Sequence, residues 1–159
     1  MPTAAPKSRR NRNAEAATPF RLEGHIFYYF SQILARRNRA LNIDLRVFGL
    51  DYQRWRVMAV LNEEAGCSML KLADLTSVDR TTLTRTLGLM QAEGLISRRE
   101  RADDRRGVAI SLTSHGRTML KQILPLVHKH TARALAGFPP SEVEALRAQL
   151  ERIVENLKR

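Results

Sequence analysis

Hydrophobic and polar positions alternate between residues 95 and 112 in a way that predicts a β-hairpin. Val108, Ile110 and Leu112 alternate with smaller or more polar residues, which is the period-two pattern of a half-buried strand. The segment 95–101 has the length and composition to pair with it. The chain therefore contains two short antiparallel strands joined by a turn.

The turn between these strands is rich in arginine. Asp103 and Asp104 are turn formers, and Gly107 relieves the exit from the turn. This arrangement puts Arg105 and Arg106 at or beside the tip of the hairpin. Guanidinium groups on a projecting ribbon suit the narrow, electronegative minor groove of DNA, although an arginine-rich turn is also compatible with a simple solvated surface.

Just upstream, the pattern is that of two helices joined by a tight turn. The segment 68–75 reads as a short helix whose first amides Ser68 can cap. Residues 76–77 form the turn, and a second helix is predicted from about residue 79 to residue 93. Gly94 ends it as a left-handed cap. This is a helix-turn-helix followed directly by a hairpin.

The second helix has two contrasting faces. Its apolar face carries Leu83, Leu87 and Met90 at helical spacing. Its opposite face carries hydroxyls and cations, namely Arg80, Thr81, Thr84 and Arg85. Such a face can enter the major groove, where arginine reads guanine edges and threonine contacts phosphate or a thymine methyl group. With Ser68 from the preceding helix, these residues form the candidate DNA-contacting set outside the hairpin.

Several segments together resemble one family of transcriptional regulators. They are residues 50–57, 72–85, 93–96, 104–106 and 112–116. Over roughly residues 20–158 the chain resembles the MarR family. The resemblance implies that Arg106 enters the minor groove, that Asp104 helps to orient it, and that the second helix of the motif reads the major groove.

The remaining helices predict a dimer. A helix is expected from Phe20 to about Leu41, and a long one after Thr113 or Ser114. The last helix carries a coiled-coil-like stripe of Val143, Leu146, Leu150, Ile153 and Leu157. That stripe either packs on its own domain or, as the resemblance also implies, lies in a two-fold interface.

The predicted fold is mainly α with a small β-hairpin wing, a winged helix-turn-helix lobe joined to a helical dimerisation region. Residues 1–19 are predicted to be a disordered basic arm, and residues 20–158 a single domain. Within it, residues 50–113 form the DNA-binding lobe, and residues 20–49 and 114–158 the dimerisation helices. A homodimer would place two recognition helices about one DNA turn apart.

Composition agrees with a nucleic-acid partner. The formal charge of +11 points to a polyanion, which is double-stranded DNA in the reading above. A long apolar run or a signal-type segment is missing from the sequence, so we expect a cytoplasmic protein without membrane contact. Glycine-rich phosphate loops, nucleophile elbows and metal-ligand spacings are also missing, so we expect no enzyme, cofactor or metal site.

The sequence says less about the signal that controls the protein than about its DNA-binding region. The resemblance implies a small effector, often an aromatic acid, and His25, Tyr29 and Trp55 are the candidate ligand-binding residues. Aromatic residues at such positions also serve as ordinary packing. Cys67 leaves a redox-responsive regulator open, although packing is the simpler role for a lone cysteine. The other alternative is an architectural DNA-binding protein that responds to no effector.

Overall fold

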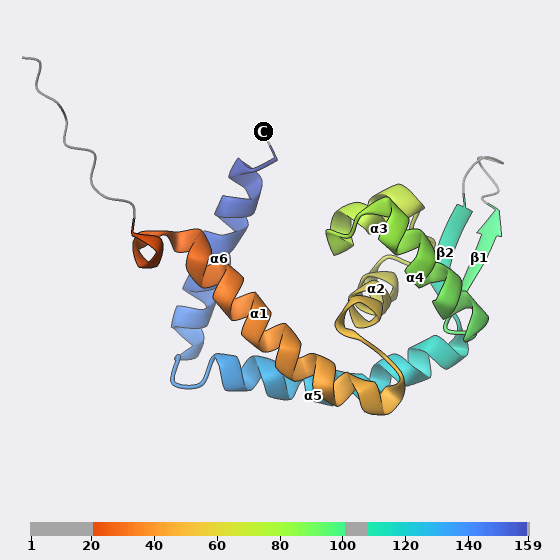
Figure 1. The fold of residues 1–159 in the computed structure, drawn as a ribbon, viewed down its shortest axis with the longest axis horizontal. Helices are drawn as coiled ribbons and strands as arrows, with labels where there is room; N and C mark the ends of the chain where they lie inside the picture. The colour runs from red at the N-terminus through yellow and green to blue at the C-terminus, as the bar shows by residue number, and fades with distance from the viewer. Residues whose placement is uncertain (1–20, 101–107, 159) are drawn as a thin grey trace, which may run out of the picture.

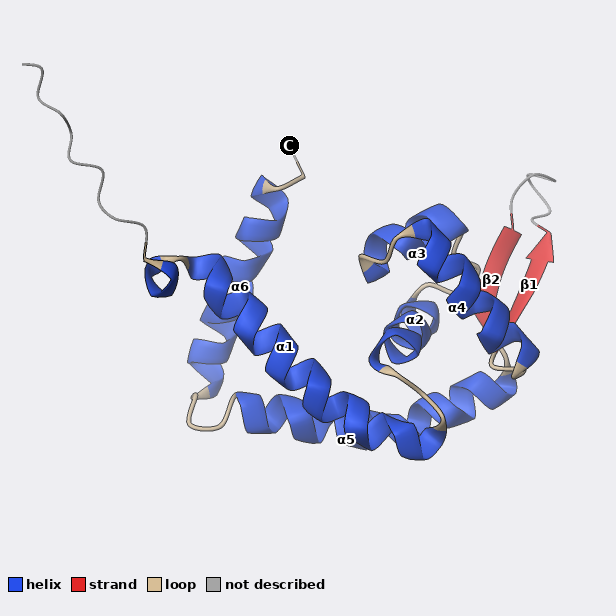
Figure 2. Ribbon diagram, viewed as in Figure 1, coloured by secondary structure: helices blue, strands red, loops and turns tan. Residues whose placement is uncertain are grey.

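The computed structural model describes residues 21–100 and 108–158. Before the lobe lie η1 (Leu22–Gly24), α1 (Ile26–Leu45) and η2 (Arg46–Phe48). The lobe contains α2 (Tyr52–Glu63), α3 (Met69–Thr76), α4 (Arg80–Ala92), β1 (Ile96–Glu100) and β2 (Val108–Leu112). It is followed by α5 (Ser114–Ala134) and α6 (Pro140–Asn156). The fold is mostly helical with one antiparallel hairpin, as predicted (Figure 2).

The elements form two parts. Figure 1 shows α2, α3, α4 and the hairpin gathered on one side, while α1 and α6 extend on the other. The long α5 leaves the hairpin and runs beneath both parts, so that it joins them. The C-terminal half of α1 packs against α5 and contributes Leu41 and Leu45 to the core.

Local sequence explains where α2, α3, α4 and α5 begin. Asp51, Ser68, Asp79 and Thr113 each precede a helix in extended backbone, and each side chain accepts a hydrogen bond from an amide three residues later. Each such cap stabilises a helix by about 1 kcal/mol. The predicted cap at Ser68 is confirmed, and of the two residues expected before the long helix, Thr113 and Ser114, it is Thr113 that caps it.

The hairpin is held in a defined register. Ile96 lies opposite Leu112, and Glu100 lies opposite Val108. Cys67 extends the pairing because its carbonyl oxygen accepts from the amide of Ile110 at 2.9 Å. The hairpin is anchored to α5 at Gly116, where any Cβ would collide with the Leu95 carbonyl oxygen. Only glycine fits there without a shift of the backbone.

The first long helix begins and ends later in the sequence than predicted. Instead of running from Phe20 to Leu41, α1 begins at Ile26 and continues to Leu45. His25 holds extended backbone (φ −96°, ψ 115°) after the short η1 turn, which interrupts the helix. At the other end the hydrophobic spacing continues through Leu45, which is fully buried.

The apolar stripe of α6 is only partly covered within its own chain, where Val143 and Ile153 are half-buried. Every residue of α6 is described, and none of them is buried. Leu146 and Leu150 each remain 37% exposed. The N-terminal half of α1 and the turn before it are similarly open, with exposed Leu22, Ile26, Phe27, Tyr29, Ile33 and Leu34. Among the described helices, none combines the length and apolar character needed to cross a membrane.

Candidate nucleic-acid interface

The turn between α3 and α4 is built from the expected residues. Ser77 adopts left-handed backbone (φ 51°, ψ 38°), a conformation that serine tolerates at some cost. The Val78 amide donates to the Ala73 carbonyl at 3.2 Å, and the buried Thr76 hydroxyl donates to the Leu72 carbonyl at 2.6 Å. These bonds fix the angle at which α4 leaves α3.

The two faces of α4 separate as the sequence predicts. Leu83, Leu87 and Met90 are fully buried. Arg80, Thr81, Thr84 and Arg85 are all exposed, and neither arginine forms an ion pair with another described residue. The Thr84 hydroxyl donates to the Arg80 carbonyl at 2.7 Å, which leaves its oxygen free to accept a further bond.

The start of α4 carries a fixed negative charge. The Asp79 carboxylate accepts from the Thr82 amide at 2.9 Å. Hydrogen bonds from the Thr82 amide and hydroxyl lower the pKa of Asp79, so this carboxylate stays ionised at the helix N-terminus. Ser68 is half-buried at the start of α3, where its hydroxyl oxygen accepts from the Lys71 amide at 3.2 Å.

The wing candidates Asp104, Arg105 and Arg106 lie outside the described residues. The strands that flank them are described. On β1 the structure shows one further residue, Arg98, that the sequence analysis did not identify. Arg98 lies opposite Ile110 on the same inward side as Ile96. Its Nε and Nη2 atoms are buried and have no hydrogen-bond partner in the described parts of the chain. A charged residue at an inward strand position was the signal available in the sequence.

The three candidate ligand residues do not meet within one protomer. His25 precedes α1, and Tyr29 lies in its first turns with 48% exposure. Trp55 lies on α2 and is covered instead by Arg37, whose guanidinium carbon is 5.5 Å from the centre of the indole ring. Arg37 follows Tyr29 by eight residues, or about 12 Å along the helix axis.

Trp55 nevertheless lies in an unusual setting. Its ring contacts Tyr52 at 5.5 Å between centroids, and Arg37 also lies 6.0 Å from the Tyr52 ring centre. The indole Nε1 is buried and finds no acceptor among the described residues. An aromatic pair with a cation over its rings and an unused N–H donor at the edge of the indole can hold a planar anion.

Cys67 has the features of a packing residue. Its side chain is 4% exposed and pairs with no other cysteine. Burial raises the pKa of the thiol, an effect that the nearby Lys71 only partly offsets. A raised pKa lowers the thiolate fraction, so the structure disfavours the redox alternative.

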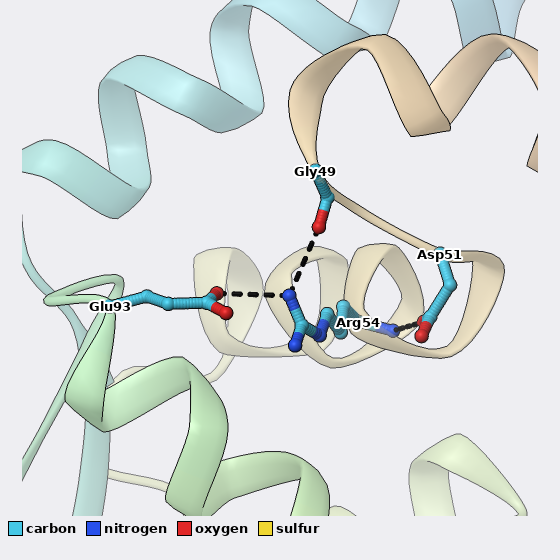
Figure 3. A network of polar contacts seen from close by, with 4 residues as sticks. All are labelled: Gly49, Asp51, Arg54 and Glu93. Carbon is cyan, nitrogen blue, oxygen red and sulfur yellow. Dashed lines mark hydrogen bonds and ion pairs between the residues drawn. The ribbon is translucent and has the colours of Figure 1, made fainter.

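A polar network that the sequence did not reveal joins α2 to the end of α4 (Figure 3). The Arg54 Nη1 donates to the Glu93 Oε2 at 2.9 Å and to the Gly49 carbonyl at 3.0 Å. The Arg54 amide in turn donates to the Asp51 carboxylate at 2.7 Å. The Arg54 side chain is only 14% exposed, whereas the Glu93 side chain is 44% exposed, so the ion pair is open to water on its Glu93 side.

Comparisons with known proteins place this architecture. A sequence model of the MarR family matches residues 48–107. The HTH-type transcriptional repressor IacR from Pseudomonas putida is 24% identical over 143 residues, which cover 90% of this chain and 86% of IacR. The structure of BpsR from Bordetella bronchiseptica, described as regulated by 6-hydroxynicotinic acid, has a TM-score of 0.77 at 20% identity, covering 86% of this chain and 98% of BpsR.

A MarR structure from E. coli in complex with operator DNA aligns with a TM-score of 0.70 at 24% identity, covering 79% of this chain and 90% of that one. A MarR-family regulator from Silicibacter pomeroyi is more similar in sequence. It is 30% identical, with a TM-score of 0.78, and the alignment covers 85% of this chain and 91% of that one. On this similarity and this fold, the chain belongs to the MarR family of transcriptional regulators.

Proposed function

We propose that this protein is a homodimeric repressor that binds a pseudo-palindromic operator and is released by a small aromatic acid. The observation that carries the proposal is the polar face of α4, where Arg80, Thr81, Thr84 and Arg85 are exposed while the opposite face is buried. A helix that is fixed on one side and bears unpaired guanidinium groups on the other is suited to the major groove.

The roles of the remaining contacts follow from this placement. Ser68 lies at the start of α3 and contacts a phosphate, while Arg106, oriented by Asp104, enters the minor groove and Arg105 adds a backbone contact. The operator complex of the E. coli relative supports this assignment by its similar fold. Such a regulator acts in the cytoplasm, where its DNA lies.

The exposed apolar surfaces support the dimer. A lone chain leaves the stripe of α6 and the N-terminal half of α1 in water, which costs roughly 25 cal/mol for each Å² of apolar surface. In the proposed dimer, residues 20–49 and 114–158 of two chains cover each other. The two-fold axis then sets the two α4 helices at the spacing of the operator half-sites.

The effector is proposed to bind at Trp55. Arg37 and Tyr52 supply the cation and the second aromatic ring, and the unpartnered indole Nε1 supplies a donor for a carboxylate or carbonyl oxygen. His25 and Tyr29 can join this site only from the partner protomer, because their own α1 places them too far away. A relative described as regulated by 6-hydroxynicotinic acid supports an aromatic acid as the ligand.

Fluorescence anisotropy tests the proposal, with the DNA upstream of the protein's own gene and a large excess of mixed-sequence competitor. We expect binding that survives the competitor at two protomers per site, and release by an aromatic acid. The overall charge of +11 favours one other candidate, an architectural protein that coats DNA without readout. Genome-wide fragment selection that recovers no preferred sequence would establish that alternative.

A further inference from the structure

The Arg54 network connects the dimerisation region to the recognition helix. On one side, the Asn42 side chain of α1 accepts from the Tyr52 amide at the start of α2, at 2.9 Å. Two residues later, Arg54 bonds the Gly49 carbonyl and the Glu93 carboxylate. Polar contacts therefore run without a gap from α1, through the first turn of α2, to the residue that ends α4.

This connection is well placed to resist bending. Gly49 has positive φ (68°), and its amide donates to the Arg46 carbonyl, so this residue lies in a hydrogen-bonded turn. The Gly49 carbonyl, which accepts from Arg54, is therefore held in a fixed position. The Arg54 backbone is held by the Asp51 cap. The Arg54 side chain is only 14% exposed, so its guanidinium group is held in place, although the Glu93 carboxylate is 44% exposed and remains partly screened by water.

The position of Glu93 gives the contact leverage. Arg80 begins α4 and Glu93 follows its last residue, so the two are about 20 Å apart along the helix axis. A tilt of about 5° at the Glu93 end would move the Arg80 end by about 1.7 Å over that length. Direct hydrogen bonds to base edges tolerate only about 0.5 Å of variation in donor–acceptor distance.

We propose that Arg54 is a positioning residue for operator recognition: it braces the C-terminal end of α4 against α1 and the Gly49 turn, and so sets the angle at which the recognition helix meets the major groove. The inference rests on the proposed operator binding. Arg54 itself lies at the opposite end of α4 from the candidate base contacts and is not expected to touch DNA.

The test is a double-mutant cycle with Arg54→Glu, Glu93→Arg and the charge-swapped double variant, measured as Kd for the operator and for mixed-sequence DNA. A matched control is Glu64→Gln, which removes the Lys71 ion pair (2.7 Å) of the same lobe without touching α4. Circular dichroism at the binding temperature confirms that each variant is folded, and Arg54→Gln provides a milder variant if charge reversal unfolds the lobe.

We expect Arg54→Glu to weaken operator binding about 5-fold or more and mixed-sequence binding far less. The swapped pair should recover at least part of that loss, since an ion pair forms again but the Gly49 contact does not. Equal losses on both kinds of DNA, or no recovery in the double variant, would overturn the proposal, because a residue that only stabilises the fold shows no such preference.

A second measurement does not depend on operator binding. Spin labels at Arg39→Cys on α1 and Leu89→Cys on α4, in a Cys67→Ala background diluted with unlabelled protein, report the distance between these helices. We expect Arg54→Glu to broaden or shift that distance and the swapped pair to restore it. If wild-type protein shows no operator preference, the proposed function fails; an unchanged distance overturns the bracing role by itself.

Discussion

The DNA-binding lobe and the arms formed by α1 and α6 satisfy their hydrophobic patterns in different ways. In the lobe, the apolar faces of α2, α3, α4 and the hairpin close on one another and leave fully buried side chains such as Leu72, Leu83 and Met58. In α6, an equally regular stripe remains open, and no residue of that described helix is buried. The same apolar periodicity therefore corresponds to a buried core in the lobe and to a largely exposed surface on α6.

The largest expected effect comes from breaking the open stripe. Leu150→Glu puts a charge in the centre of the proposed two-fold interface, and we expect a monomer with an intact lobe. Losing the second binding unit should weaken operator binding by about 100-fold or more. Light scattering after size exclusion measures the mass, and anisotropy the affinity.

The neighbouring change Gln149→Glu is the control for Leu150→Glu, because it adds the same charge to an exposed position beside the stripe. It should leave the dimer intact. A dimer that survived Leu150→Glu would mean that the α6 stripe is not the interface.

The closed core makes the opposite prediction. Leu87→Ala removes a fully buried side chain of α4 and should lower the free energy of unfolding by about 2–5 kcal/mol. Leu89→Ala, two residues away on the same helix and 48% exposed, should change it by less than about 1 kcal/mol. Urea unfolding followed by circular dichroism measures both, and similar values for the two variants would contradict the division of α4 into two faces.

The same contrast explains what could be predicted from the sequence. Caps and periodicity are local features, so the sequence predicts the cap at Ser68 and the two faces of α4, and it narrows the cap of α5 to Thr113 or Ser114. Arg37 over Trp55 and Arg54 on Glu93 join residues from different helices, and period and composition carry no signal for such pairs. His25, Tyr29 and Trp55 are an example: the sequence identifies side chains of suitable chemistry, but it does not show how far Tyr29 lies along α1 from the residue that contacts Trp55, Arg37.

A smaller effect is expected at the wing. Arg106→Ala should weaken operator binding by about 1–3 kcal/mol if its guanidinium occupies the minor groove. Arg152→Ala, which removes the same charge from the exposed surface of α6, controls for the loss of general attraction to DNA. Unchanged operator affinity in the Arg106 variant would argue against the wing assignment. Equal losses in both variants would mean that Arg106 contributes only long-range electrostatic attraction to DNA.

The smallest effect tests the charge that starts the recognition helix. Asp79→Asn keeps a capping oxygen but removes the negative charge at the N-terminus of α4. Because hydrogen bonds from Thr82 lower the pKa of Asp79 in the folded protein, the carboxylate stabilises the fold above the unfolded value of about 3.9. That contribution is lost as the pH falls through the lower, folded pKa.

Wild type should therefore be more stable than the Asp79→Asn variant at neutral pH, with the difference shrinking in acid. Urea unfolding over that pH range measures this difference, with Asp74→Asn at an exposed position of α3 as the control. A difference that did not change with pH would show that the charge of Asp79 does not stabilise the start of α4, and that the hydrogen bond from the Thr82 amide does so by its geometry alone.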